Sequence, residues 1–353
     1  MKTAETQRKP TLKTVICSSL MSWLRNDSSA ATAADSGVGN DRIDWLRVVP
    51  YLLVHLLCLF VFVVGVSPIA VITMVTLYLV RMFAITGFYH RYFSHRSFKT
   101  SRVGQFVFAV LGAAAVQRGP IWWAAHHRHH HAHSDQEADI HSPVRRSFLW
   151  SHTGWFLSQR GYTPDLTRVR DLLRFPELKL LDRYDVLVPT ALGVSLFFFG
   201  LALQHWAPQL GTNGWQMLVW GFFVSTVLCY HATYTINSLS HRFGRQRYRT
   251  NDGSRNNWWL ALLTLGEGWH NNHHHYPASA RQGFFWWEID ITYYGLRVLS
   301  LLGIIWDLKP VPANVRASIE RREVTNPGIV SVNLPAVDPT ATVPPPTVNQ
   351  RAS

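Results

Sequence analysis

The sequence predicts an all-α integral membrane protein with four transmembrane helices and a helical cytoplasmic cap. Only 16% of the 353 residues are charged, whereas about 25% is usual for a soluble domain. The chain holds four apolar windows near the length of about 20 residues that a bilayer span requires. Its 15 Trp, 12 Tyr and 19 Phe are typical of membrane interfaces and apolar tunnels. These features exclude a soluble secreted protein.

The four predicted spans come in two pairs. Residues 45–66 and 68–88 follow each other with almost no loop, and 186–205 and 215–236 form the second pair. The segment 104–116 is apolar but too short to cross a bilayer, which predicts a buried or interfacial helix. The segment 283–306 mixes charged residues with many aromatics, which predicts a pair of amphipathic interfacial helices.

The distribution of Lys and Arg predicts the orientation of these spans. Neither short connection, at 66–68 or at 205–214, carries a basic residue, while the N-terminal stretch, the 88–186 gap and the region after 236 carry many. By the positive-inside rule, both termini and the long gap then face the cytoplasm. The net charge of +13 follows from this topology and from contact with anionic membrane lipid. Nucleic acid is not an expected partner, because no nucleic-acid motif accompanies the charge.

The composition of the two ends divides the chain into three parts. Residues 1–42 are polar and rich in Ser and Ala, and residues 311–353 are rich in Pro, Thr and Val. Both are expected to be disordered tails. The membrane domain then occupies residues 43–310.

Histidine is a rare residue, and the 18 histidines of this chain are gathered rather than scattered. The groups are His90 with His95, the run 126–133, His241, and the run 270–275. Each lies at or beyond the predicted cytoplasmic end of a span. Segments that are far apart in the sequence therefore bring histidines to one side of the membrane.

The spacing within the groups matches one face of a helix. His270, His273 and His274 stand at i, i+3 and i+4. The run 126–133 allows the same pattern in two registers, 126/129/130 or 127/130/131. Neutral imidazole is a common metal ligand, because one ring nitrogen binds the ion while an acceptor orients the other. So many ligands exceed the needs of one ion, and they predict a site for two metals in the cap.

The identity of the metal is a weaker inference from the residues. Imidazole suits zinc, copper, iron and nickel alike. The three cysteines (Cys17, Cys58 and Cys229) are widely separated, which excludes a disulfide scaffold and argues against cysteine-ligated zinc. Spare coordination positions beside an apolar path favour oxygen-activating iron.

The remaining histidines are not expected to bind the metals directly. Ordinary surface or core roles are expected for His55, His152, His205 and His231, and roles beside the ligands or in solvent for His129, His133, His141 and His275. The alternative for the whole protein is a metal transporter with histidine-rich loops. A transporter would place polar ligands near the middle of its spans, where the windows offer little beyond His55, Arg81 and His231.

The order of the motifs resembles that of the membrane fatty-acid desaturases, in particular the stearoyl-CoA-type delta-9 branch. The motifs are HxxxxH (His90, His95), HRxHH (His127, Arg128, His130, His131), NSxxH (Asn237, His241) and GExxHNxHH (Gly266, Glu267, His270, Asn271, His273, His274). The resemblance covers roughly residues 47–310. It also selects one register of the run 126–133, because Trp123, Ser134 and Asp135 fit the family pattern only with His127, His130 and His131.

The resemblance implies which residues hold the metals. The implied centre contains two iron ions. Its implied ligands are His90, His95, His127, His130, His131, His241, His270, His273 and His274, with Asn237 acting through a water.

The resemblance also implies a substrate and partners. Trp123 would line the acyl tunnel, and Arg160 matches a basic position linked to coenzyme A. The sequence departs from the family at Ala125 and His126, where the animal enzymes carry Arg and Asp that contact coenzyme A. Acyl-CoA is the expected carrier, and acyl carrier protein and phospholipid remain open. A separate protein would donate the electrons.

The implied reaction is the oxygen-dependent introduction of a cis double bond at carbons 9 and 10 of a saturated fatty acyl chain. An unactivated methylene has no acidity for a side chain to exploit, so the cofactor must supply the difficult chemistry. The alternative is a membrane hydroxylase or ketolase built on the same di-iron scaffold. The expected location is the bacterial inner membrane, with the metal site on the cytoplasmic side.

Overall fold

The computed structural model describes residues 21, 23–26, 41–43 and 45–319. The predicted N-terminal tail lies almost entirely outside these residues. In the predicted C-terminal tail the structure describes only 311–319, which contain α16 (Ala313–Arg316) and η9 (Ala317–Ile319).

Helices make up nearly all of the regular structure. The first half contains α2 (Trp45–Leu57), η2 (Cys58–Phe60), α3 (Val61–Val64), α4 (Pro68–Phe83), the π-helix η3 (Ala84–Ser94), α5 (Arg102–Ala113) and α6 (Pro120–His133). The middle contains η4 (Trp150–Gly154), α7 (Trp155–Leu157), α8 (Gln159–Tyr162), η5 (Leu166–Val169), η6 (Leu172–Arg174), α9 (Pro176–Arg183), α10 (Leu187–Trp206) and η7 (Pro208–Leu210). The last part contains α11 (Gly214–Gln216), η8 (Met217–Val224), α12 (Ser225–Ser238), α13 (Trp258–Leu263), α14 (His270–His275) and α15 (Ile291–Leu301).

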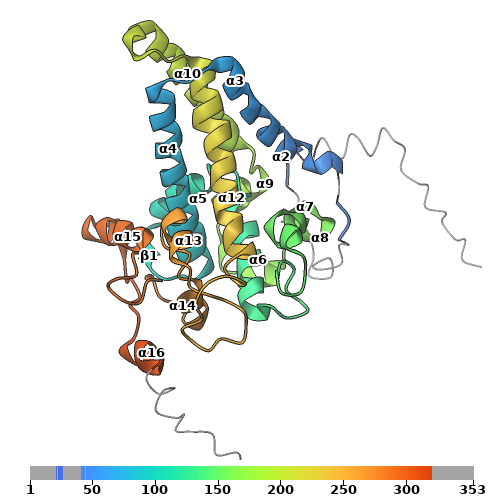
Figure 1. Ribbon diagram of the computed structural model, residues 1–353, viewed down its shortest axis with the longest axis vertical. Coiled ribbons are helices and arrows are strands. Elements are labelled where there is room, and N and C mark those ends of the chain that lie inside the picture. The colour runs from blue at the N-terminus through green and yellow to red at the C-terminus, as the bar shows by residue number, and fades with distance from the viewer. Residues whose placement is uncertain (1–20, 22, 27–40, 44, 320–353) are drawn as a thin grey trace, which may run out of the picture.

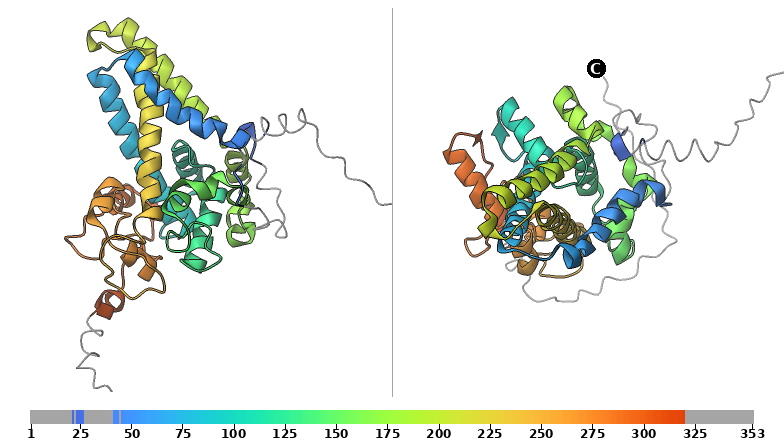
Figure 2. Two further views of the ribbon diagram at one scale, coloured as in Figure 1. Left: turned by 45° about the vertical axis from the view of Figure 1, so that its right-hand side comes forward. Right: turned by 90° about the horizontal axis from the view of Figure 1, so that it is seen from above.

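The predicted fold class is confirmed. Four helical stretches of the described residues are long and apolar enough to cross a membrane: Trp45–Val64, Pro68–Ser94, Leu187–Trp206 and Gly214–Ser238. They form the elongated upper part of the molecule, and α6, α13 and α14 gather at its lower end (Figure 1). In a second view α2 leans away from α4 and α12, while the lower end remains a separate cap (Figure 2).

Local sequence signals set the ends of these helices. Gly65 has a φ of +69° and separates α3 from α4, in a backbone region that favours glycine. The Ser67 side chain then accepts a hydrogen bond from the Ala70 amide, and Pro68 occupies the first turn of α4. Both features are typical of the start of a helix. Gly65, Ser67 and Pro68 therefore account for the tight turn between the first two spans.

The apolar segment 104–116 forms the single short helix α5, as its length predicts. The predicted pair of helices over 283–306 is wrong, because only α15 forms there. Residues before α15 satisfy their backbone amides with carboxylates instead: Gly283 donates to Asp290 and Phe285 to Glu288. After α15, the strand β2 (Ile305–Trp306) pairs antiparallel with β1 (Lys99–Thr100).

The main hydrophobic core lies where the second span enters the cap. Its largest fully buried members include Met82, Tyr89, Phe93, Ile121 and Leu178. Residues from η3, α6 and α9 thus pack in one cluster. A close-packed core holds its side chains in fixed rotamers, so it fixes the ends of η3 and α6 that carry the histidines.

A close approach between α10 and the connection to α11 allows a test of this packing. A Cβ added at Gly200 would lie 2.5 Å from the Asn213 carbonyl oxygen, whereas one added at Gly193 would meet its nearest neighbour at 3.6 Å. We expect Gly200→Ala to destabilise the protein by about 1–3 kcal/mol through overpacking. Gly193→Ala, on the same helix, should change stability by less than about 0.5 kcal/mol. Thermal unfolding in lipid nanodiscs would measure both, and equal effects would contradict this close approach of the two segments.

Candidate metal centre

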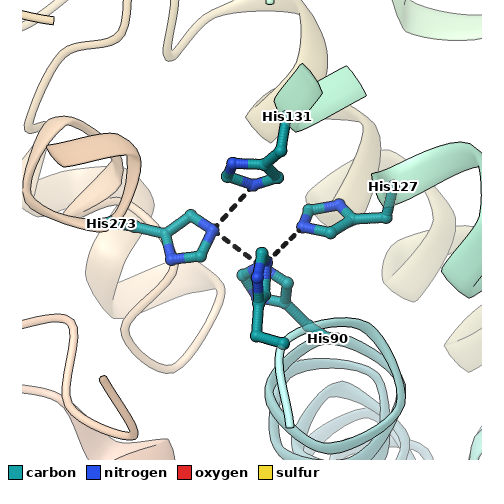
Figure 3. Close-up of side chains that lie close together, drawn as sticks. His90, His127, His131 and His273 are labelled. Atoms are coloured by element: carbon teal, nitrogen blue, oxygen red, sulfur yellow. Dashed lines mark hydrogen bonds between the residues drawn. The ribbon is translucent and has the colours of Figure 1, made fainter. Parts of the chain in front are cut away.

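Five histidines from three parts of the chain converge on one point in the cap. These are His90, His95, His127, His131 and His273, and one ring nitrogen of each lies within 4.8 Å of the others. We call this set the first histidine group. Figure 3 shows four of these rings turned toward a shared centre, with His127 and His131 on α6 and His273 on the opposite side.

The Nε2 atoms of the first group lie almost in contact. The distance is 2.7 Å between His95 and His127, 2.9 Å between His131 and His273, and 3.0 Å between His90 and His273. Two neutral imidazole nitrogens at this distance can both turn their lone pairs toward a cation. A metal ion at the centre could therefore be bound by one nitrogen from each of the five rings. The donor set therefore fits a nitrogen-ligated transition metal.

The π-helix η3 explains the spacing of its two histidines. In a π-helix the amide of residue i+5 bonds to the carbonyl of residue i, and the His95 amide donates to the His90 carbonyl at 3.2 Å. The ring centroids of His90 and His95 are consequently 4.9 Å apart. The HxxxxH motif thus places both rings in one group through a π-helical turn.

Four more histidines form a second group beside the first. His130, His241, His270 and His274 also bring one nitrogen each within 4.8 Å of one another. The His241 and His270 Nε2 atoms are 3.0 Å apart. The His274 Nε2 atom is buried and has no hydrogen-bond partner. A buried lone pair without a partner is costly, and a metal ion at this point would satisfy it.

The two helical triplets divide between the groups. On α6, His127 and His131 at i and i+4 face the first group while His130 faces the second. On α14, His273 faces the first group while His270 and His274, again at i and i+4, face the second. Each helix therefore lies between the two groups and supplies ligand atoms to both.

Carboxylates hold several rings in place from behind. The Nδ1 atom of each such histidine lies against a buried carboxylate, which accepts a hydrogen bond from Nδ1–H and leaves Nε2 free for a metal. The pairs are His130 with Asp139 (3.0 Å), His241 with Asp135 (2.8 Å), His274 with Asp252 (2.6 Å) and His90 with Glu267. This arrangement fixes the tautomer as well as the orientation of the ring.

These carboxylates are anchored in turn. Asp135 accepts hydrogen bonds from the Ser142 hydroxyl and the Gly253 amide, so it links two loops behind the second group. Glu267 pairs with the fully buried Arg91 at 3.1 Å, and Arg91 also pairs with Asp290 at 3.0 Å. Removing one partner of a buried pair leaves an uncompensated charge. The cap around the two histidine groups therefore depends on this network.

Burial keeps most of the rings neutral. It lowers the pKa of His95, His127, His131, His270 and His273 well below the ordinary value, and neighbouring histidines lower it further. Burial also lowers the pKa of His274 to about 4, although Asp252 opposes the change. Neutral imidazole is the form that binds metal, so these rings need no deprotonation near neutral pH.

His130 differs from the other rings. Burial lowers its pKa, but the charge and hydrogen bond of Asp139 outweigh burial and raise it. For Asp135, burial raises the pKa while the hydrogen bond from His241 outweighs it and lowers the pKa to about 2. Asp135 is therefore ionised near neutral pH and can accept the hydrogen bond from His241.

Two cavities lead to the histidines. The larger, of about 250 Å³, is lined by residues of α2, α6 and α12, including Tyr51 and Tyr234. The smaller, of about 50 Å³, reaches His90 and His270 between apolar side chains such as Ile85. Four residues line both cavities: Trp123, His127, Thr233 and Asn237. The two cavities therefore adjoin beside the first group.

The structure places the remaining predicted site residues as follows. Trp123 lies parallel to the His127 ring at 5.0 Å and lines both cavities. Asn237 lines the same cavities between the two groups. Arg160 is among the lining residues of neither cavity, and its Nη1 atom lies 3.8 Å from Asp41.

The other histidines of the run 126–133 and of its surroundings lie outside both groups. His126 points to the Gly161 carbonyl (3.1 Å) and His129 to the Ala138 carbonyl (2.9 Å). His133 contacts Arg168, and His275 contacts Ser318. His141 lies beside Asp139, with Nδ1 3.7 Å from the carboxylate. The register 126/129/130 is therefore not the one that brings nitrogens together.

Sequence reasoning missed three supporting residues. Asp139 and Asp252 orient ligand histidines, and Asp290 anchors Arg91. A weak signal existed, because each acidic residue stands in a charge-poor chain near a histidine motif. Proximity in sequence, however, does not show which ring a loop carboxylate will meet.

Comparison with known proteins agrees with this geometry. A family model described as Fatty acid desaturase matches residues 66–297. The chain belongs to the fatty acid desaturase family.

Named relatives of this desaturase cover most of its length. The sn-1 stearoyl-lipid 9-desaturase of Anabaena variabilis is 35% identical over 271 residues, which is 76% of this chain and 94% of that protein. The Delta-9 acyl-lipid desaturase 1 of Arabidopsis thaliana is 38% identical over 275 residues, 76% of this chain and 84% of that protein. An acyl-CoA 5-desaturase of Anemone leveillei is 38% identical over 244 residues, 68% of this chain and 71% of that protein.

The role of the carboxylates can be tested at Asp252. We expect Asp252→Asn to weaken metal binding by about 10-fold or more, because an uncharged amide no longer fixes the His274 tautomer. Competition with a chelator would measure the affinity of the purified desaturase. Asp307→Asn is the matched control, since Asp307 forms an exposed ion pair with Lys99. Unchanged affinity in Asp252→Asn would show that this carboxylate does not support the site.

Proposed function

We propose that this desaturase uses two iron ions and dioxygen to introduce a cis double bond at carbons 9 and 10 of a saturated fatty acyl chain. The observation that carries the proposal is the pair of adjacent histidine groups beside an apolar cavity. Iron would be held by His90, His95, His127, His131 and His273 in the first group, and by His130, His241, His270 and His274 in the second. Asn237 would add a water-mediated contact.

The donor set is compatible with iron, and the oxygen-dependent reaction favours iron among the metals that imidazole binds. The two ions would supply the activation of dioxygen that removes two hydrogens from unactivated carbons. An all-nitrogen shell backed by carboxylates leaves the ring nitrogens as strong donors. The His274 Nε2 lone pair, buried without a protein partner, is consistent with an ion at the second group.

The protein itself would position the chain and exclude water. Met82, Ile85 and Ile236 give the smaller cavity apolar walls next to His90 and His270, which suits methylene groups and not polar substrates. Trp123 would hold the chain against His127, since its ring lines both cavities. Fixing two carbons at one depth is what selects the position of the double bond.

The carrier of the acyl chain is proposed to be a membrane glycerolipid. Sequence alone favours acyl-CoA, but the positions that would contact coenzyme A are occupied differently here. Ala125 is fully buried, and His126 is 6% exposed with its ring turned to the Gly161 carbonyl. Neither residue offers the charged side chain that contacts coenzyme A in the animal enzymes, although His126 lines the larger cavity. The relatives from Anabaena variabilis and Arabidopsis thaliana carry acyl-lipid names, which supports the same choice.

The proposal includes an orientation of the protein in the membrane and a separate source of electrons. We infer that both termini and the histidine groups face the cytoplasm, in agreement with the positions of Lys and Arg, and that the membrane is the bacterial inner membrane. Electrons would come from a separate protein. Both histidine groups gather at one end of the spans, with His90 four residues before the end of the second span, and not near the middle of the spans, which disfavours the transporter alternative.

Expression in a desaturase-deficient host would test the reaction. We expect a new monounsaturated fatty acid with its double bond at carbon 9, detected by mass spectrometry of the lipids. His131→Ala removes a nitrogen from the first group and should abolish the product. His129→Ala on the same helix, whose ring bonds to a carbonyl outside the groups, should retain it. Absence of any new monounsaturated acid would contradict the proposal, and a product that gained oxygen would favour a hydroxylase or ketolase.

A second assay would identify the carrier. Purified protein with a reductant system would be offered acyl-CoA, acyl carrier protein and phospholipid substrates side by side. We expect phospholipid-bound chains to be desaturated at least about 10-fold faster, a difference worth about 1.4 kcal/mol. Preferred turnover of acyl-CoA would overturn the glycerolipid assignment while leaving the reaction type intact.

A further inference from the structure

Two loops of the cap carry arginines that have no carboxylate partner. These loops are residues 134–149, after α6, and 239–257, after α12. They contain seven arginines, and only two of these, Arg146 and Arg247, form an ion pair with a carboxylate. Within the part of the chain that the structure describes, the other five form none: Arg145, Arg242, Arg245, Arg249 and Arg255.

The acidic residues of the same two loops do not offset this charge at the surface. Three of the four accept hydrogen bonds from rings of the second histidine group: Asp135, Asp139 and Asp252. Only Glu137 is exposed. The cations that follow His95 differ, because carboxylates pair with them: Arg96 with Asp171, Lys99 with Asp307 and Arg102 with Glu177. The outer surface beside the second group therefore carries positive charge that the protein itself does not neutralise.

The two loops meet and form one exposed surface. The Arg242 side chain joins them, since its Nε atom donates to the Pro143 carbonyl at 2.9 Å. Apolar side chains next to these arginines are exposed as well, Val144 by 55% and Phe243 by 59%. We call this surface the arginine patch, and its exposed members are Val144, Arg145, Arg242, Phe243, Arg245 and Arg249.

One residue separates the arginine patch from a ring of the second group. The Arg145 Nε atom donates to the Asp135 carbonyl at 3.1 Å, and the Asp135 carboxylate accepts a hydrogen bond from His241 Nδ1 at 2.8 Å. Val144 reaches the same place, because a Cβ built on Gly253 would lie 3.4 Å from Val144 Cγ2 and 3.2 Å from the Asp135 carboxylate. Electron transfer slows steeply with distance, so this short route from the surface to the second group favours it.

The location of the arginine patch disfavours the membrane as its partner. The segment 239–257, which carries most of the patch, lies at the lower end of the cap, away from the upper part that the spans form (Figure 1). Other parts of the cap suit contact with lipid better, because α13 and α15 expose Trp258, Trp259 and Leu301. Large apolar and aromatic side chains are typical of membrane interfaces. The patch, with more arginines than apolar side chains, fits an acidic protein.

A surface of this composition suits a short-lived complex with an acidic protein. Complementary charges speed the encounter and orient the two partners, and they add less to the affinity than to the rate of association. Electron-transfer complexes bury small interfaces and are weak, so the partner can leave after each electron. Val144 and Phe243 would supply a limited apolar contact beside the charges.

We propose that the arginine patch binds an acidic iron–sulfur protein that carries one electron at a time, and that the electrons pass by way of Asp135 and His241 to the second group. The inference rests on the proposed function, because it identifies where the separate electron donor would bind. Each donor molecule is oxidised by one electron, so two encounters supply the two electrons of one turnover. With these electrons, dioxygen and two protons from solvent, the saturated chain loses two hydrogens and two waters form.

Charge reversal in the arginine patch tests the binding site. The double variant Arg245→Glu/Arg249→Glu replaces two exposed arginines whose side chains form no hydrogen bond within the described residues, so the fold and the metal content should not change. Arg170→Glu is the matched control, because Arg170 is exposed, follows η5 outside the two loops and has no carboxylate partner among the described residues. The probe is a plant-type [2Fe–2S] ferredoxin, an acidic one-electron carrier, added to metal-loaded desaturase in nanodiscs of neutral lipid.

Biolayer interferometry would measure binding, and stopped-flow oxidation of the reduced ferredoxin would measure electron transfer. At low salt we expect the double variant to bind at least about 10-fold more weakly than the wild type and to accept electrons more slowly, whereas Arg170→Glu should change either value by less than about 2-fold. Because salt screens exposed charges, the difference between wild type and double variant should shrink at high salt. Reduction by dithionite, which needs no docking surface, should be equal in all three proteins.

Several results would overturn the proposal. These are equal binding of ferredoxin by the wild type and the double variant, binding by the wild type that does not depend on salt, or no binding at all. Loss of bound phosphatidylglycerol from the double variant in native mass spectrometry, with ferredoxin binding unchanged, would assign the patch to membrane lipid instead. Binding and reduction need no acyl substrate, so a wild type that accepts electrons at the patch but forms no double bond would contradict the proposed function and support the docking site.

Discussion

The hydrogen bond from a histidine Nδ1 to a buried carboxylate is the interaction that holds the cap together. When the Nδ1–H of a histidine donates to an acceptor, the ring is held with its Nε2 lone pair toward the metal position. Asp135, Asp139, Asp252 and Glu267 provide that acceptor for four rings. Their own partners come from loops and from the buried Arg91. The hydrogen bonds of these carboxylates therefore hold the loops between the helices in place around the histidine groups.

The membrane part solves a different problem, which is to bring distant histidines to one depth. The second span continues as the π-helix η3 into the cap, and α12 ends just before His241. Both spans therefore deliver ligands at the same end of the molecule. α6 and α14 lie in the cap between the two histidine groups and supply both. The larger cavity reaches this point from the side of α2 and adjoins the smaller, apolar cavity beside the first group.

Histidine side chains occur in two kinds of surroundings in this protein. In the cap, Asp252 accepts a hydrogen bond from His274, while burial lowers the pKa of that ring to about 4, so the ring is neutral near neutral pH and able to bind a metal. Along the larger cavity, His55, His231 and His152 have only each other, a hydroxyl and backbone carbonyls as partners. The partners of the ring nitrogens therefore distinguish the histidines that converge on one point from those that bond only to one another and to neighbouring groups.

Hydropathy and helical periodicity depend only on residues within a few turns of one another. They were therefore enough to predict the four spans and the helical faces that carry the histidines. With the positions of Lys and Arg, they also predicted that the histidines share one side of the membrane. They also restricted the run 126–133 to two registers. The division of the triplets between two groups arises from tertiary contacts, since His131 meets His273 across 142 residues and His241 meets Asp135 across 106. The predicted second helix over 283–306 failed for the same reason: Asp290 and Glu288 bind backbone amides there, a contact that hydrophobic periodicity does not encode. Contacts of this length depend on how the loops pack, and no local pattern records them.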